Sequence, residues 1–317
     1  MLENFVFSLN SALPLFFVMA VGYLIRRKNW IDDGFVKMAN NIIFYVALPV
    51  KLFSDVFYTS FSDYFDIGFI LFLIVATCLT VLIAVLFGQL VVKDKRLLSA
   101  FVQGAFRGNF LYIGLSLMEN ITGSIGAKAP LGIAIMVPLY NILAVLIFAF
   151  LNEKGEETTK PKFSKILMDI VKNPLIASVL LGIILSQFNF NLPIVIDRTF
   201  SYFAVVATPL ALITIGASFK LGQLAQSLKM ALYASVLKLV IFPLLVVLAA
   251  IQLGFSAEDV LLVYVLFGVP TATISYVFSV NMGGNGNLAS SIIMVTTLLA
   301  NLTMTGFIFA FKMMGMI

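Results

Sequence analysis

The stretch GVPTATISY, residues 268–276, interrupts an apolar run and decides the predicted fold. Proline removes a backbone hydrogen-bond donor and clashes with the preceding helical turn, whereas glycine tolerates the resulting bend. A helix break is therefore predicted at Gly268 and Pro270. A second interruption, Arg107-Gly108-Asn109, places Gly108 160 residues before Gly268. Inside a membrane, the backbone groups that a break frees must line a cavity or meet another element. The two breaks together therefore predict a central binding site.

The 160-residue offset between these breaks also aligns other helix-breaking residues. It places Pro14 on Pro174, Gly22 on Gly182, Pro49 on Pro209, Gly123 on Gly283, Gly126 on Gly286 and Asn141 on Asn301. Four of the ten glycines in residues 1–151 recur, whereas a glycine share of 21 in 317 predicts fewer than one by chance. A duplication with paired helix breaks is typical of secondary transporters. We therefore predict a first repeat over residues 1–151, a cytoplasmic linker over 152–171 and a second repeat over 172–317.

The composition indicates an all-α polytopic membrane protein. Hydrophobic residues make up 61% of the chain and charged residues 11%, against about 25% charged residues in soluble domains. Ten membrane-spanning helices are predicted, at about residues 5–25, 36–54, 67–92, 98–118, 130–151, 172–188, 196–219, 229–252, 258–280 and 287–312. Arg26-Arg27-Lys28 follow the first span directly, which favours a retained helix over a cleaved signal peptide.

Positive residues are distributed unevenly between the loops. Fourteen lysines and arginines lie in odd-numbered loops, and only Lys128 and Arg198 lie in even-numbered ones. Because positive loops stay cytoplasmic, both termini are predicted to be extracytoplasmic in a multi-pass protein of the cell membrane. Five spans per half is an odd number, so the second half must enter the membrane upside down, as a 5+5 inverted repeat. Since no single domain is basic, membrane lipid is the expected partner of the surface rather than nucleic acid.

Several kinds of chemistry are excluded by residues that the chain lacks. It has no histidine and a single cysteine, Cys78. His-based metal sites, His proton relays and His-dependent catalytic pairs are therefore excluded, and neither a metal nor a cofactor is expected. All acidic residues, including Asp55 in the second loop, are assigned to loops, span ends or interfacial positions. An intramembrane enzyme needs a nucleophile and base, or metal ligands, within its spans, so the protein is predicted not to be an enzyme.

Three cations remain within the predicted spans: Lys51, Arg107 and Lys238. Arg107 and Lys238 lie about 13–14 Å into a hydrocarbon core about 30 Å thick. Burying an unpaired charge so deeply is costly and usually functional, so the missing counter-ion is predicted to be an anionic substrate. Lys51 is expected to snorkel to the membrane surface, and snorkelling is an equal alternative for Lys238.

The half-helices that begin at the two breaks direct free N–H donors and partial positive charge at the same region, which attracts a carboxylate. The predicted substrate contacts are Arg107, Gly108, Asn109, Tyr112, Lys238, Val269, Pro270, Thr271, Thr273 and Ser275. Structural helix breaks are predicted at Pro49, Pro209 and Gly268. The proline pair is expected to shape the helices rather than to contact the ligand.

The motifs around these breaks resemble those of the auxin efflux carrier family. FRGNFLYIGL, residues 106–115, is similar to its Asn-then-Gly-Leu-Pro segment, although Ser116 stands where the family usually has proline. Five further patterns of the family have a counterpart in this chain. The Pro-x-Ala pattern is matched by Pro270-Thr271-Ala272, the Gly-Gly pattern by Gly283-Gly284 and the Ser/Thr-Thr-Leu pattern by Thr296-Thr297-Leu298. The Leu-Pro pattern is matched by Leu48-Pro49 and the Gly-Ala-Ser pattern by Gly216-Ala217-Ser218. The order and spacing of these motifs extend over the whole chain.

The resemblance implies that spans four and nine cross at the substrate site, with Asn109 and Pro270 as the crossover residues. It also implies an organic anion as cargo, and the short linker favours a bacterial type that carries malate or malonate. The leading hypothesis is a secondary transporter of a small carboxylate that works by alternating access. The alternatives are a carrier of an aromatic, auxin-like weak acid, for which Tyr112 and Tyr276 are suited, and a non-transporting membrane receptor. The sequence leaves open whether a proton or Na⁺ is coupled, whether the pathway is a channel and whether the protein is a homodimer.

Overall fold

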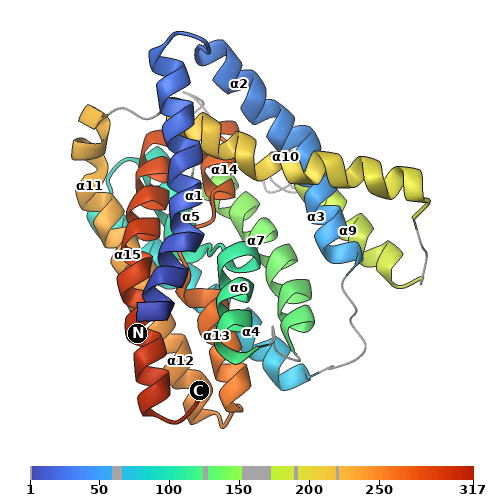
Figure 1. Ribbon diagram of the computed structural model, residues 1–317, viewed down its shortest axis with the longest axis vertical. Helices are drawn as coiled ribbons and strands as arrows, with labels where there is room; N and C mark the ends of the chain where they lie inside the picture. The colour runs from blue at the N-terminus through green and yellow to red at the C-terminus, as the bar shows by residue number, and fades with distance from the viewer. Residues whose placement is uncertain (1, 59–65, 124–127, 152–172, 189–191, 219–220) are drawn as a thin grey trace.

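A computed structural model describes residues 2–58, 66–123, 128–151, 173–188, 192–218 and 221–317 (Figure 1). All regular secondary structure in these residues is helical, which confirms the predicted all-α class. The elements are α1 (Leu2–Arg27), α2 (Asp33–Ile42), η1 (Ile43–Ala47), α3 (Leu48–Phe57), α4 (Ile67–Val91), α5 (Lys95–Phe106), η2 (Phe110–Gly114), α6 (Leu115–Thr122), α7 (Ala129–Leu151), α9 (Pro174–Ser186), α10 (Ile194–Ser218), α11 (Leu221–Val236), η3 (Leu237–Ile241), α12 (Phe242–Gln252), α13 (Ala257–Gly268), α14 (Ile274–Asn281) and α15 (Gly286–Met313). The three elements labelled η are single π-helical segments. The predicted linker, residues 152–171, lies outside the described residues.

Six helical stretches are long and apolar enough to cross a membrane: Asp33–Phe57, Ile67–Val91, Ala129–Leu151, Ile194–Ser218, Ser227–Gln252 and Gly286–Met313. Helix α4 shows how such a helix meets its surroundings. Its exposed apolar residues recur every three or four positions, at Leu71, Val75, Leu79, Leu82, Leu86 and Leu90. Such spacing places them on one helix face, and a soluble protein rarely leaves so long an apolar stripe uncovered. The structure is therefore that of a polytopic membrane protein.

The helices are interrupted at the two predicted breaks but not at the two predicted prolines. Helix α5 ends at Phe106 before η2 begins, and α13 ends at Gly268 before α14 begins. Pro49, in contrast, lies in the first turn of α3, within one continuous helical stretch, because the π-helical segment η1 precedes it. Pro209 lies inside the uninterrupted helix α10. The helices therefore continue through both prolines: α10 is uninterrupted at Pro209, and the π-helical segment η1 directly precedes the turn of α3 that contains Pro49.

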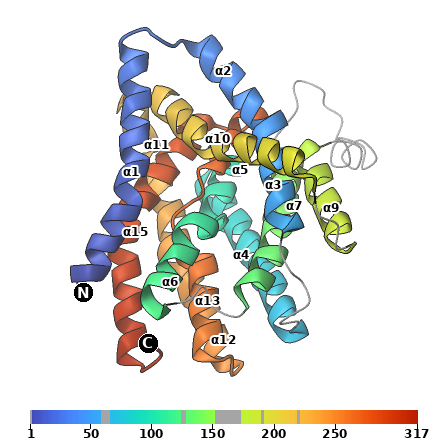
Figure 2. The same ribbon diagram turned by 45° about the vertical axis from the view of Figure 1, so that its right-hand side comes forward.

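Close backbone contacts join α1 to α10 and α9 to α3; Figures 1 and 2 show α1 crossing one end of α10 and α9 lying next to α3. A Cβ atom added at Gly22 would overlap the carbonyl oxygen of Ile213 in α10. One added at Gly182 would lie 2.9 Å from the carbonyl oxygen of Phe53 in α3. Glycine is required at both positions because no other residue lets two backbones approach so closely. Gly182 follows Gly22 by 160 residues, and Ile213 follows Phe53 by the same distance. The two contacts are therefore equivalent under the sequence offset.

An ion-pair cluster links three helix starts at one end of the molecule. Lys128, next to the start of α7, donates to Asp66 Oδ2 at 2.7 Å and to Asp259 Oδ2 at 2.9 Å. Asp66 is also the N-cap of α4, where its Oδ1 accepts a hydrogen bond from Phe69 N. The hydrogen bond from Lys128, followed by that from Phe69 N, lowers the pKa of Asp66 below its ordinary value. The cluster therefore holds Asp66 in its charged form.

We expect Asp66→Asn to lower the melting temperature at pH 7 by about 1–3 °C, because the pair is partly exposed to solvent. Asparagine keeps the N-cap, so the difference isolates the charge. A lowered folded pKa gives stability that is present above the unfolded pKa, about 3.9, and is lost as pH falls through the folded pKa. The difference between the wild type and the variant should thus be constant from pH 5 to 8 and shrink progressively as the pH falls below about 4, towards the lowered folded pKa. Thermal unfolding in detergent measures it, and a difference that does not shrink as the pH is lowered below 4 would contradict the assignment.

Candidate functional site

The two helix breaks lie against each other and are joined by backbone hydrogen bonds. Asn109 N donates to the Pro270 carbonyl oxygen at 2.8 Å, and Ala272 N donates to the Arg107 carbonyl oxygen at 3.1 Å. These bonds form an isolated antiparallel bridge between Gly108 and Thr271. Thr271 N donates in addition to Thr296 Oγ1 at 3.2 Å. The N–H groups predicted to be free for a carboxylate are therefore partly used within the crossing, and side chains must supply most of the anion recognition.

Gly108 is needed at the centre of the crossing because there is no room for a side chain. A Cβ atom there would lie 2.9 Å from Lys238 Nζ, 3.1 Å from Val269 Cγ2 and 3.2 Å from the Leu266 carbonyl oxygen. Only a residue without a Cβ lets the backbone approach these atoms so closely. The bridge therefore depends on the glycine that interrupts the earlier apolar run.

Arg107 is a buried cation without a carboxylate partner in the described part of the chain. Its Nη2 donates to Asn141 Oδ1 at 3.0 Å, and its Cζ lies 4.9 Å from the ring centroid of Phe278. Its Nη1 is buried and has no hydrogen-bond partner among the described residues. A buried donor without an acceptor is unfavourable, and a guanidinium binds carboxylates with two parallel hydrogen bonds. The residue is thus chemically suited to an anionic ligand.

An open cavity adjoins the crossing, with about 630 Å³ of empty space when the open space at its mouth is included. Of the predicted contacts, Arg107, Gly108, Asn109 and Thr273 line it. Most of the remaining wall is apolar and comes from η1, α3, α7, α10 and α14, with Ile43, Leu52, Val137, Ala211 and Val277 as examples. A concave, mostly apolar cavity with a few polar groups is the usual form of a small-molecule site. The lining of this cavity matches that description.

The cavity wall also contains an ion pair that the sequence did not predict. Lys51 Nζ lies 2.9 Å from Asp55 Oδ2 and 3.1 Å from Asp55 Oδ1, and both residues line the cavity. Asp55 was assigned to a loop, but α3 extends to Phe57 and places it on the helix, one turn after Lys51. The assignment was wrong because the apolar run was ended three residues too early. Lys51 was expected to snorkel alone, whereas it pairs with this carboxylate.

Removing both charges of this pair should cost less stability than the sum of the two single removals. The side chains of Lys51 and Asp55 are 15% and 21% exposed, so a single change leaves a mostly buried charge without its partner. We expect Lys51→Met and Asp55→Asn each to lower the melting temperature by about 3–6 °C, and the double variant by less than the sum. Thermal unfolding of the four proteins in one detergent is the measurement. Strictly additive effects would show that the pair contributes no coupling.

Five other predicted contacts, all with described side chains, lie near the crossing but are not part of the cavity wall. Val269 packs against Gly108, and Thr271 Oγ1 donates to the Gly104 carbonyl oxygen at 2.7 Å. Ser275 Oγ is buried and has no partner among the described residues. Lys238 Nζ donates to the Phe267 carbonyl oxygen at 2.5 Å. The Pro270 carbonyl oxygen takes part in the bridge, and the side chain of Tyr112 lies outside the described residues.

Two residues that the sequence analysis did not select complete the surroundings of Arg107. They are Asn141 on α7 and Phe278 on α14. Asn141 had a detectable signal, because the 160-residue offset places it on Asn301, and an asparagine within an apolar span needs a polar partner. Phe278 had no such signal, because nothing in the sequence distinguishes it among the 31 phenylalanines.

Comparison with known proteins agrees with this arrangement of breaks and motifs. The model of a family described as "Membrane transport protein" matches residues 7–308. A Rhizobium meliloti protein named "Putative malonate transporter" is 28% identical over 308 residues, which cover 95% of this chain and 94% of that protein. A Methanocaldococcus jannaschii protein named "Uncharacterized transporter MJ1031" is 23% identical over 91% of this chain and 94% of its own length. Escherichia coli "Uncharacterized transporter YfdV" is 20% identical, with 84% and 85% covered.

The family model spans almost the whole sequence, including both helix breaks and the residues that line the cavity. This match agrees with the family that the motifs resemble and with a membrane-integral, helical structure. The protein therefore belongs to the membrane transport protein family, that of the auxin efflux carriers.

Proposed function

We propose that the protein is a secondary transporter that carries a small organic anion by alternating access, with Arg107 as the residue that binds its carboxylate. The observation that supports this most strongly is that the Arg107 side chain is buried and has a hydrogen-bond donor left unsatisfied in the part of the chain that the structure describes. It is 5% exposed, lines the cavity at the crossing and has one amino group without a partner among the described residues. A carboxylate that enters the cavity would supply the missing acceptor. Asn109 and Thr273 line the same cavity and would contact the rest of the ligand.

A ten-span, 5+5 inverted repeat accounts for the contacts around this site. Its spans would be α1, α2 to α3, α4, α5 to α6, α7, α9, α10, α11 to α12, α13 to α14 and α15. The equivalent Gly22–Ile213 and Gly182–Phe53 contacts support a two-fold relation between the halves. Both ends of the chain lie at the same end of the molecule (Figures 1 and 2), as an even number of crossings requires.

The contacts between loops support the proposed orientation. Lys128 joins Asp66 and Asp259, which brings the second, fourth and eighth loops together on one side. Asn285 N donates to the Arg96 carbonyl oxygen at 3.1 Å, which brings the third and ninth loops together. With the basic, odd-numbered loops cytoplasmic, both termini are extracytoplasmic.

The charges in the cavity wall favour a carboxylate substrate with an apolar or compact body. Arg107 contributes a positive charge, whereas Lys51 is paired with Asp55. Malonate is the first substrate to test, because it is the cargo in the name of the Rhizobium meliloti relative. The second candidate is an aromatic weak acid, which the largely apolar wall favours.

Uptake into proteoliposomes tests the proposal. Purified protein is reconstituted, and the entry of labelled malonate is compared with that in protein-free liposomes. Unlabelled malate, malonate, a simple monocarboxylate and an aromatic acid are then added as competitors. Saturable uptake with competition by small carboxylates supports the first candidate, and competition by the aromatic acid alone supports the second. If reconstituted protein takes up no carboxylate and binds none, the transport proposal is wrong.

A further inference from the structure

Lys238 is a buried cation that faces the helix crossing rather than the cavity. It lies on η3, between α11 and α12, and only 1% of its surface is exposed. Its Nζ donates to the Phe267 carbonyl oxygen at 2.5 Å, and no ion pair in the described part of the chain includes it. It is not among the residues that line the cavity. Its position therefore calls for an explanation other than contact with the substrate.

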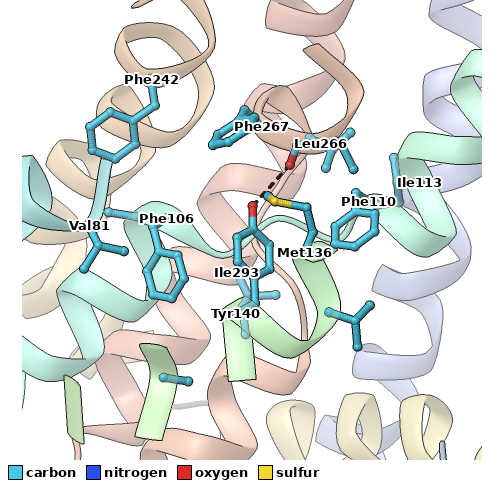
Figure 3. Packing of buried hydrophobic residues seen from close by; sticks show 14 of the residues in the cluster. Val81, Phe106, Phe110, Ile113, Met136, Tyr140, Phe242, Leu266, Phe267 and Ile293 are labelled. Atoms are coloured by element: carbon cyan, nitrogen blue, oxygen red, sulfur yellow. Dashed lines mark hydrogen bonds between the residues drawn. The ribbon is translucent and has the colours of Figure 1, made fainter. Parts of the chain in front are cut away.

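The ammonium group lies at the C-terminal end of an interrupted helix. The last carbonyl groups of a helix lack intrahelical partners and carry partial negative charge. In α13, which ends at Gly268, the Phe267 carbonyl accepts from Lys238, and the Leu266 carbonyl accepts from the hydroxyl of Tyr140 at 3.3 Å (Figure 3). In α5, the Gly104 carbonyl accepts from Thr271 Oγ1. Lys238 is thus the amine member of a set of donors that satisfy the carbonyls at the two breaks.

The backbone around the ammonium group is shaped to admit it. A Cβ atom at Gly108 would lie 2.9 Å from Lys238 Nζ and 3.2 Å from the Leu266 carbonyl oxygen. The glycine therefore leaves room for a cation between the two broken segments. In transporters with discontinuous helices, the carbonyls and half-helix C-terminal ends at such a position coordinate the coupling Na⁺ or H⁺.

We propose that Lys238 is a built-in cation that occupies the monovalent-cation position at the helix crossing, so that the protein needs no Na⁺ there. The ammonium neutralises the carbonyl ends of α13 and holds the two breaks together permanently. Shortening the Lys238 side chain leaves an empty space beside the carbonyl groups. That space becomes a site for a small alkali cation such as Na⁺ or Li⁺. The consequence for uptake rests on the proposed transport function, whereas the occupation of the site does not.

Thermal unfolding of purified protein in different salts tests the proposal without any substrate. The melting temperature is measured in the chlorides of Na⁺, Li⁺ and N-methylglucamine at equal ionic strength. The wild type should melt at the same temperature in all three. Lys238→Ala should melt lower in N-methylglucamine and rise by about 2–4 °C or more in Na⁺ or Li⁺. Lys238→Met, which fills the space without a charge, should melt lower and not respond to any salt.

Two results would overturn the inference: stabilisation of the wild type by Na⁺ over N-methylglucamine, or a Lys238→Ala protein that is insensitive to Na⁺ and Li⁺. If Lys238→Ala does not fold, the salt dependence of the wild type and the stability of Lys238→Met still test the inference. A Lys238→Met protein as stable as the wild type would show that the charge of Lys238 is not needed at the crossing. Uptake separates this inference from the transport proposal. Uptake that requires Na⁺ refutes the built-in cation alone, whereas the expected melting pattern without any uptake refutes the transport proposal alone.

Discussion

Replacing Arg107 by glutamine should reduce kcat/KM for carboxylate uptake by at least about 30-fold. Removing one partner of a buried, hydrogen-bonded charge pair costs about 2–5 kcal/mol of binding free energy, and about 1.4 kcal/mol corresponds to a factor of ten. In the proposed complex, the substrate carboxylate is the partner of Arg107. Glutamine keeps a polar amide that donates hydrogen bonds, but it offers the carboxylate neither a charge nor a two-pronged donor. Initial rates of uptake into proteoliposomes over a range of substrate concentrations give the ratio.

The same substitution should leave stability unchanged or raise it. The guanidinium is buried without a carboxylate partner in the described residues, so its charge is desolvated without full compensation. Replacing such a charge by a neutral side chain removes that cost. We therefore expect the substrate-free Arg107→Gln protein to melt no lower than about 2 °C below the wild type. A large loss of uptake at unchanged stability distinguishes a binding residue from a structural one.

Two further variants serve as controls for Arg107→Gln. Arg107→Lys keeps the charge but loses the planar donor pair, so its uptake should lie between those of the wild type and Arg107→Gln. Arg198→Gln makes the same chemical change at an exposed arginine near the start of α10, and its uptake should equal that of the wild type. If Arg107→Gln transports as fast as Arg198→Gln, Arg107 does not bind the substrate, and the positively charged Lys51 becomes the residue to test.

The features that the sequence predicted well depend on backbone chemistry. The breaks at Gly108 and Pro270 were predictable because glycine and proline act locally, whatever the tertiary surroundings. At Pro49 and Pro209, in contrast, the helices continue: the π-helical segment η1 precedes Pro49, and α10 is uninterrupted at Pro209. The sequence therefore shows where a break is allowed, and the neighbouring helices decide whether it occurs.

The charged residues of the site were harder to place, because their partners lie on other helices or depend on where a helix ends. Arg107 was selected from its depth in a span, but its contacts with Asn141 and Phe278 come from α7 and α14. Asp55 was missed as a cavity residue because one additional helical turn moves it from a loop into the wall. For Lys238, depth alone did not distinguish contact with a substrate from contact with a backbone carbonyl. These distinctions depend on which neighbouring helix a side chain faces as well as on its depth in the membrane. The pattern of a single sequence indicates the depth but not the neighbouring helix.

Gly216→Ala should destabilise the protein more than any other glycine-to-alanine change discussed here. A Cβ atom at Gly216 would overlap the carbonyl oxygen of Met19, a backbone atom of α1 that cannot move without displacing the helix. Overpacking of this kind typically costs about 1–3 kcal/mol and more where backbone must shift, so we expect the melting temperature to fall by about 6–12 °C. Gly306→Ala is the matched control, because it lies inside α15 with open space around its added Cβ. Since alanine favours the helix by about 0.5–1 kcal/mol, that variant should melt at or slightly above the wild-type temperature. If Gly216→Ala is as stable as Gly306→Ala, α1 and α10 are not in close backbone contact, and the inverted-repeat proposal loses one of the two equivalent helix contacts that support it.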